Sequence, residues 1–276
     1  MCLYIFMEVI HVFSAPLLKR TIKTSGKLWM IFTGILVLQM FLVLSMFASA
    51  PGNGRVFRGI PAEITAVLGI DMGADALTAY LASHSFAFFN PLISMIYGSI
   101  AANRLVAQKV ESGTMVYLLA SPNKRERIAG TQAVFLAAGL FAMFLCTTAA
   151  GLGACAVFFR GKLEIVPFLL LNAGGFCLAF CLSGISFMAS CISNDTRFSL
   201  TIGAGIPMIF LLIRMLANLG GSLEALEFAT MFTLFNTADV LEESMSVFWK
   251  FPLLAVVGAV FYQIGMKQFA KKDLPV

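Results

Sequence analysis

The chain has 276 residues, of which 59% are hydrophobic and only 12% are charged, and its formal net charge is +5. Soluble domains carry about 25% charged residues, so a mean hydropathy of +0.91 excludes an ordinary soluble domain and predicts a membrane protein. The positive charge does not indicate a nucleic-acid partner, because the basic residues fall where membrane topology would place them. We expect one all-α, polytopic membrane domain.

The first 27 residues lack the basic start of a signal peptide, and their charges follow the apolar part. A narrow polar stripe at helical spacing crosses an otherwise apolar segment, and a basic stretch suited to anionic headgroups comes after it. We therefore predict an interfacial amphipathic helix over residues 1–27, followed by a transmembrane domain over 28–276. The alternative is a frayed terminus. The stripe consists of Tyr4, Glu8, His11 and Ala15.

Six stretches reach the length of about 20 apolar residues that a helix needs to cross the hydrocarbon core. The third and fourth are long enough to tilt or to extend beyond the bilayer. The six predicted transmembrane helices cover residues 28–50, 84–103, 129–159, 165–192, 198–218 and 247–268.

An even number of spans puts both termini on the same side of the membrane, and the basic residues indicate which side that is. Thirteen Lys and Arg residues fall in the terminal segments and the loops on the side of the termini, against five on the other side, with Arg214 inside a span. Since cytoplasmic loops carry the excess of Lys and Arg, we predict that both termini are cytoplasmic.

Two of the predicted outer loops are longer than simple turns. Residues 51–83 contain turn residues and then a stretch able to hold a short helix. Residues 220–246 contain the apolar string ALEFATMFTLF, which is too short to span. We predict that this second loop forms re-entrant outer helices before the last span, because non-helical backbone at membrane depth must be buried in protein or face water.

One patterned polar segment, residues 104–128, interrupts the apolar sequence as RLVAQKVESGTMVYLLASPNKRERI. Gly113 permits a turn, Thr114 can cap a short helix with apolar residues at three- and four-residue spacing, and Pro122 stops that helix. The pattern predicts a short amphipathic helix across the cytoplasmic ends of two spans. Its apolar face suits a groove on another protein; an interfacial loop whose leucines dip into lipid is the alternative.

The string VESGTMVYLLASPNKRERIAG resembles the E-x-G-T-x-x-x-L-L-x-x-P-x-x-R signature of type-2 ABC exporter permeases. The ending FAKKDLPV is similar to the basic-Asp-Leu close of that family, and the six spans and the interfacial helix also match, so the resemblance covers essentially the whole chain. Asn123-Lys124 departs from the small or apolar residue and Ser of many members, which bears on the subfamily. The matching residues are Glu111, Gly113, Thr114, Leu118, Leu119, Pro122 and Arg125.

The resemblance implies a permease that pairs as a homo- or heterodimer in the cell membrane of a prokaryote. Each protomer would engage a separate cytoplasmic ABC ATPase subunit through the short loop helix, and ATP and Mg²⁺ would bind to that ATPase. The substrate path would lie at the protomer interface, lined mainly by the first, second and fifth spans. The implied ATPase-coupling residues are Glu111, Ser112, Gly113, Thr114, Met115, Leu118, Leu119, Pro122, Lys124 and Arg125.

The chain itself carries no signature of an enzyme. The P-loop pattern G-x-x-x-x-G-K-[ST] is missing, since Gly26-Lys27 and Gly161-Lys162 are both followed by Leu. The only histidines, His11 and His84, are not placed for a serine or zinc protease. The six cysteines lack metal-ligand spacing and are typical of small buried hydrophobic residues. We expect no catalytic residue, no metal and no cofactor bound by this chain.

Three polar residues within predicted spans are candidates for a substrate path: Gln39, Asn90 and Arg214. Gln39 also suits an interhelical hydrogen bond, Asn90-Pro91 a kink, and Arg214 snorkelling or pairing with an outer-loop acid. Ser183-Gly184 favours close helix packing. The apolar path favours a hydrophobic or amphipathic substrate such as a drug, an antimicrobial peptide or a lipid. The alternatives are an ATP-independent carrier or channel and a non-transporting membrane anchor or sensor.

Overall fold

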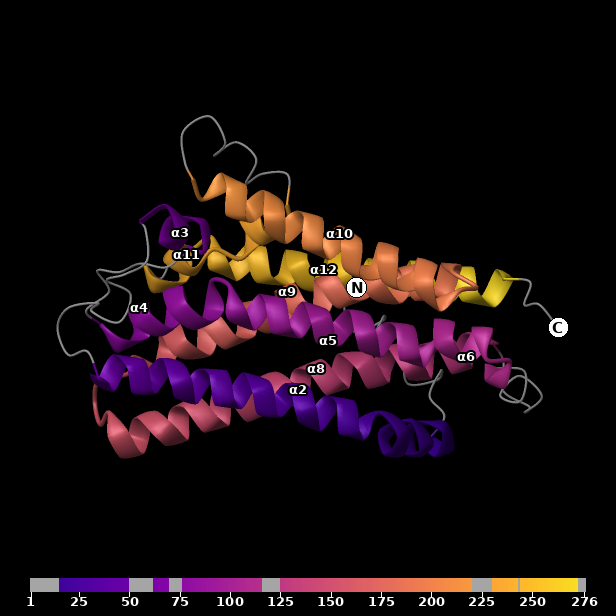
Figure 1. Cartoon of the computed structure of the whole chain (residues 1–276), viewed down its shortest axis with the longest axis horizontal. Coiled ribbons are helices and arrows are strands. Elements are labelled where there is room, and N and C mark those ends of the chain that lie inside the picture. The colour runs from indigo at the N-terminus through magenta and orange to yellow at the C-terminus, as the bar shows by residue number, and fades with distance from the viewer. Residues whose placement is uncertain are drawn as a thin grey trace.

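The computed structural model describes residues 15–49, 62–69, 76–115, 125–219, 230–242 and 244–272. Every regular element within these ranges is a helix, and six helical segments are long and apolar enough to cross a membrane. The six lie side by side in one elongated bundle (Figure 1). The predicted all-α fold with six apolar spans is therefore confirmed, and the protein belongs to the class of multi-pass membrane proteins.

The first span is α2 (Ala15–Ser49), and the second combines α4 (Leu77–Leu81), a π-helix (Ala82–Phe86), α5 (Phe89–Leu105) and α6 (Ala107–Glu111). The remaining spans are α8 (Arg125–Phe158), α9 (Ile165–Ile192), α10 (Thr196–Ala217) and α12 (Val247–Lys271). In the described parts of the connections there are three short helices: α3 (Ala62–Val67), the 3₁₀ helix η4 (Met231–Leu234) and α11 (Thr237–Leu241).

The first two spans begin earlier than predicted. Helix α2 runs from Ala15 without a break at the predicted boundary between residues 27 and 28, because the polar stretch after Ala15 also suits a helix. Residues 1–14 lie outside the described residues, so the interfacial helix stays a prediction there. The second span begins at Leu77, seven residues before the predicted residue 84, because the end of the predicted loop 51–83 is buried helix.

Helix α9 is the centre of the bundle, since it contacts α5, α8, α10 and α12. Small residues allow these close approaches. A Cβ added to Gly98 of α5 would lie 2.9 Å from Ser183 Cβ, and one added to Gly184 would lie 3.0 Å from the carbonyl oxygen of Gly258 in α12. The close packing predicted for Ser183-Gly184 is therefore confirmed, and Ser183 also bonds to the Tyr262 hydroxyl at 2.7 Å.

The antiparallel spans gather the polar loop segment at one end of the bundle. The start of α2, all of α6, the starts of α8 and α10 and the ends of α9 and α12 lie together, at the right in Figure 1. We call this the basic end, because these segments carry ten Lys and Arg residues whose side chains the structure describes: Lys23, Lys27, Arg104, Lys109, Arg125, Arg127, Arg197, Lys267, Lys271 and Lys272.

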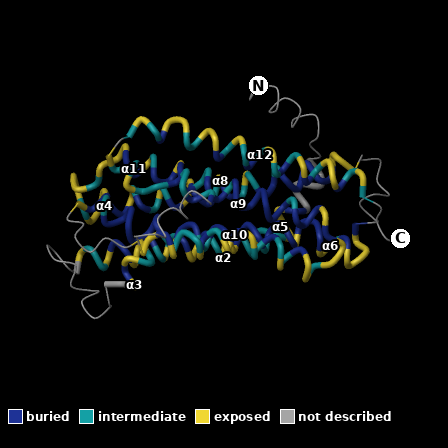
Figure 2. The backbone as a smooth tube through the Cα atoms, turned by 90° about the horizontal axis from the view of Figure 1, so that it is seen from above, coloured by how far each residue is buried: buried dark blue, intermediate teal, exposed yellow. Residues whose placement is uncertain are grey.

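Helix α5 lies between α2 and α10, with contacts to both, and these three helices share the face turned to the viewer in Figure 1. Exposed positions follow the outer sides of the bundle, whereas buried positions run through its interior (Figure 2). The outer sides of α2 and α10 carry exposed Ile, Leu, Met and Phe side chains. Such surfaces suit the hydrocarbon core of a membrane, where exposed apolar side chains need no protein partner.

The described part of the second long loop packs onto the spans. Phe232 and Phe235 are buried, and η4 contacts both α10 and α12 while α11 contacts α9. These apolar side chains explain why the string around them is hydrophobic without being long enough to span. Residues 220–229 lie outside the described residues, so the re-entrant arrangement stays a prediction.

Candidate functional site

The end of α6 turns sharply at the basic end. Gly113 has a φ of +68°, a left-handed conformation that glycine adopts without strain, so the turn predicted at Ser112-Gly113 is confirmed. The hydroxyl of Thr114 donates to the Lys109 carbonyl at 3.2 Å and lies 2.8 Å from the Ser112 hydroxyl. Thr114 thus provides a hydrogen-bond donor to a carbonyl near the end of α6. Its role as the cap of the helix that follows stays a prediction, because residues 116–124 lie outside the described residues.

Glu111 ties this turn to the fifth span. Its Oε2 accepts a hydrogen bond from the backbone N–H of Thr196 at 3.1 Å, across 85 positions of the sequence. The N–H groups in the first turn of a helix have no partner within the helix, and the helix dipole favours a carboxylate there. Within α10's own cap, Asp195 Oδ1 accepts from the N–H of Arg197 at 3.0 Å. Glu111 therefore links the turn at the end of α6 to the start of α10.

Arg125 ties the other end of the polar segment to the end of the chain's last span. Its guanidinium donates to the Lys272 carbonyl at 2.8 Å. The Lys272 ammonium in turn donates to the carbonyls of Cys191, at 3.1 Å, and Ser193. A cation at the last carbonyls of α9 is favoured by the helix dipole. Burial lowers the pKa of Lys272, an effect that the nearby Cys191 opposes.

Met115 does not face outward. Its side chain is 2% exposed and belongs to the buried cluster that contains Val110, Ile128 and Leu136. The prediction that Met115 is part of the docking face needs correction, because an apolar repeat identifies a buried stripe without saying whether the chain's own bundle or a partner covers it. The other predicted coupling residues, Leu118, Leu119, Pro122 and Lys124, lie outside the described residues.

The structure separates the three predicted path residues. Gln39 Oε1 accepts a hydrogen bond from Ser85 at 3.1 Å, which is the interhelical bond foreseen as an alternative, while its Nε2 has no partner among the described residues. Asn90 is 2% exposed at the start of α5, and its Oδ1 likewise has no partner among the described residues. Neither side chain lines the cavity described below.

Arg214 lies near the end of α10 that is opposite the basic end. Its guanidinium carbon is 5.2 Å from the centre of the Phe232 ring, within the range of a cation–π contact. The single ion pair among the described residues, Lys250 with Asp239, does not involve it. Arg214 thus links α10 to η4 through an aromatic ring. The predicted pairing with an outer-loop acid stays a prediction, because Glu224 and Glu227 lie outside the described residues.

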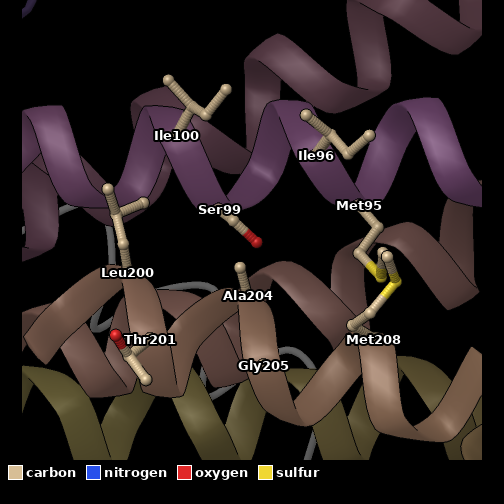
Figure 3. Close-up of a pocket in the computed structure, with 9 residues that line it drawn as sticks. All are labelled: Met95, Ile96, Ser99, Ile100, Leu200, Thr201, Ala204, Gly205 and Met208. Atoms are coloured by element: carbon tan, nitrogen blue, oxygen red, sulfur yellow. The ribbon is translucent and has the colours of Figure 1, made fainter. Parts of the chain in front are cut away.

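A cavity of about 340 Å³ lies between α5 and α10 (Figure 3). It opens on the surface of the bundle, since Ile96 and Met208 in its lining are 39% and 43% exposed. A Cβ added to Gly205 would meet no atom within 4 Å, so this glycine contributes open space. The lining is almost entirely apolar and consists of Met95, Ile96, Ser99, Ile100, Leu200, Thr201, Ala204, Gly205 and Met208.

Beneath this cavity a polar seam joins three helices. The Ser99 hydroxyl lies 3.0 Å from that of Ser186, which donates to the Gly203 carbonyl at 2.6 Å. Ser190 and Ser199 form a second contact at 2.8 Å. This seam was not predicted from the sequence. Its signal is the repetition of serine at three- and four-residue spacing along one face of α9, at positions 183, 186 and 190.

No protein-family model matches the chain, and a search of curated proteins finds no match either.

Proposed function

We propose that this chain is the transmembrane permease subunit of an ATP-driven ABC exporter, driven by a separate cytoplasmic ATPase subunit. The observation that carries the proposal is the attachment of the polar segment to distant spans at both ends. Glu111 holds the start of α10, and Arg125 holds the residue after α12. A partner that pushes on residues 116–124 would act on several spans together.

The arrangement of the spans supports the same function. The first, second and fifth spans form one face of the bundle, with α5 between α2 and α10. This is the set of spans that the family resemblance assigns to the substrate path at the interface of two protomers. The cavity between α5 and α10 opens on this face and is apolar, which suits a hydrophobic or amphipathic substrate.

In the proposed mechanism the ATPase subunit binds ATP and Mg²⁺, and this chain contributes no catalytic residue. Closure of the ATPase would move the loop, and the Glu111 carboxylate would carry that movement to α10 while Arg125 carries it to the ends of α9 and α12. Movement of α10 relative to α5 would change the cavity between them. The substrate would then leave toward the side opposite the basic end.

The experiment is co-purification with the ATPase encoded beside this chain, followed by ATPase and export assays of Glu111→Ala and Leu118→Asp. Leu118→Asp places a charge on the predicted docking face, so we expect loss of complex formation. Glu111→Ala should leave the complex intact but reduce export about tenfold, since one charge-assisted hydrogen bond is removed. Asp195→Ala is the matched control, because Asp195 caps the same helix without linking it to the loop.

Normal complex formation and normal export in both variants would contradict the coupling role. Transport by the purified chain without ATP would instead support a carrier or channel. ATPase binding without movement of any substrate would support a membrane anchor or sensor.

A further inference from the structure

We propose that the groove between α5 and α10 is a binding site for an anionic phospholipid, with one acyl chain in the apolar cavity and the phosphate held by Arg104 and Arg197. This inference goes beyond the proposed transport function and does not depend on an ATPase partner. It combines the cavity with two basic side chains that continue its lining toward the basic end.

The two helices run antiparallel, so their lining residues pair along the groove. Met95 and Met208 lie side by side at one end, whereas Ile100 of α5 and Leu200 and Thr201 of α10 lie toward the other end (Figure 3). The contact between Glu111 and the N–H of Thr196 confirms this direction. The chain that leaves α5 and the chain that enters α10 therefore meet at the same end of the groove.

Helical spacing then places an arginine on each wall at that end. Arg104 follows the lining residue Ile100 by four positions, and Arg197 precedes the lining residue Thr201 by four, so each lies one turn beyond the cavity. Both side chains are exposed, and neither forms an ion pair within the described residues. The nearby carboxylates of Glu111 and Asp195 are bonded to backbone N–H groups of α10.

Guanidinium groups at the same end of one groove attract an anion. The arginine fork matches the geometry of a phosphate and can bind it with two parallel hydrogen bonds.

The length of the groove fits one leaflet of a membrane. At 1.5 Å per residue, the nine residues from Met95 to Arg104 cover about 14 Å, and half of the hydrocarbon core is about 15 Å. An acyl chain attached to a phosphate at the level of the arginines would thus reach the end of the cavity near Met95 and Met208. The cavity's aliphatic and thioether lining offers this chain apolar contacts along that whole distance.

The test uses the purified full chain in nanodiscs made of equal amounts of phosphatidylglycerol and phosphatidylcholine with matched acyl chains. Native mass spectrometry then counts the lipids that each protein retains. The wild type should retain phosphatidylglycerol about tenfold more than phosphatidylcholine, as two charge-assisted contacts to one phosphate would give. The double variant Arg104→Gln, Arg197→Gln should lose this preference, whereas Lys267→Gln, at an exposed basic residue of α12, should keep it.

A matched pair of glycine variants tests the acyl-chain part of the site. Gly205→Leu fills the cavity and should reduce retention of both lipids about tenfold. Gly153→Leu on α8 should leave retention unchanged, since a Cβ at Gly153 also meets no atom within 4 Å but lies outside the cavity.

Equal retention of the two lipids by the wild type would overturn the proposal, as would a preference that survives loss of both arginines. Full lipid retention by Gly205→Leu would also overturn it. If that variant changes only the ratio of monomer to dimer, the groove is a contact between copies of the chain and not a lipid site.

Discussion

The second span and α10 are both apolar enough to cross a membrane, yet they occupy opposite environments. In the second span, Leu77–Glu111, 67% of the apolar stretch is buried inside the bundle, whereas in α10 the share is 22%. The second span, the more buried of the two, also has the lowest mean hydropathy of the six spans. A span that neighbouring helices shield can carry polar side chains, while a span that faces lipid needs an apolar surface.

Particular residues show the difference. The interior side of the second span carries the buried polar residues Asn90, Ser94, Ser99 and Asn103. Helix α10 instead exposes Ile206, Met208, Ile209, Leu212 and Leu216. Hydropathy therefore recognises the exposed apolar surface of α10 well and underestimates the length of the second span, whose first turns are buried in protein.

The largest expected effect contrasts a glycine in each of these helices. Gly98→Leu places a side chain where a Cβ would already lie 2.9 Å from Ser183 Cβ, and overpacking of this kind costs about 1–3 kcal/mol. Gly205→Leu on α10 meets open space and should instead gain up to about 1 kcal/mol from helix propensity. Thermal unfolding of the two variants in the same detergent measures the difference. Equal losses in both would contradict the contrast in packing.

A second comparison removes one hydroxyl from each helix. Ser99→Ala deletes the contacts of Ser99 to Ser186 and to the Gly203 carbonyl and should lower the free energy of unfolding by about 0.6–1.5 kcal/mol. Thr201→Ala deletes only a bond to the Arg197 carbonyl within the same exposed helix, so its effect should stay within about 0.5 kcal/mol. Denaturant titrations would measure both. A larger loss of stability for Thr201→Ala than for Ser99→Ala would contradict the claim that the polar seam around Ser99 stabilises the bundle.

The cation–π contact between Arg214 of α10 and Phe232 of the second long loop can be tested by a double-mutant cycle. Arg214→Leu and Phe232→Leu should each destabilise the protein, and the double variant should lose about 0.5–1 kcal/mol less than the sum of the two, because both remove the same cation–π contact. Additive losses would show that the two side chains act independently. Arg214→Lys serves as the control that keeps the charge.

The smallest expected effect concerns pH at the end of α9, the helix that shields the second span. Burial lowers the pKa of Lys272 below its ordinary value of 10.5, so the unfolded chain binds this proton more tightly than the folded chain. The free energy of unfolding should therefore rise with pH in the window between the lowered pKa and 10.5. Melting temperatures measured across this window should show the rise in the wild type and a smaller one in Lys272→Met. If the melting temperature of Lys272→Met rises with pH as much as that of the wild type, another group causes the rise. The control is Lys267→Met, at an exposed lysine.

The sequence predicted most clearly the features whose limits depend on local composition and turn chemistry. The span over residues 165–192 has the predicted limits in the structure, and the turn at Gly113 lies where the sequence places it. It missed the early start of the second span and the orientation of Met115. Both errors concern apolar residues that the chain's own helices cover, and periodicity cannot identify the covering element.

The sequence by itself determined the class of the protein, the six apolar spans and the position of the one patterned polar segment, because these depend on local composition and spacing. Only the tertiary structure decided which spans are central, that Glu111 reaches Thr196, and that α5 and α10 together line one cavity. The last two facts join residues more than 80 positions apart, and they follow from the packing of helices whose small residues permit close approach.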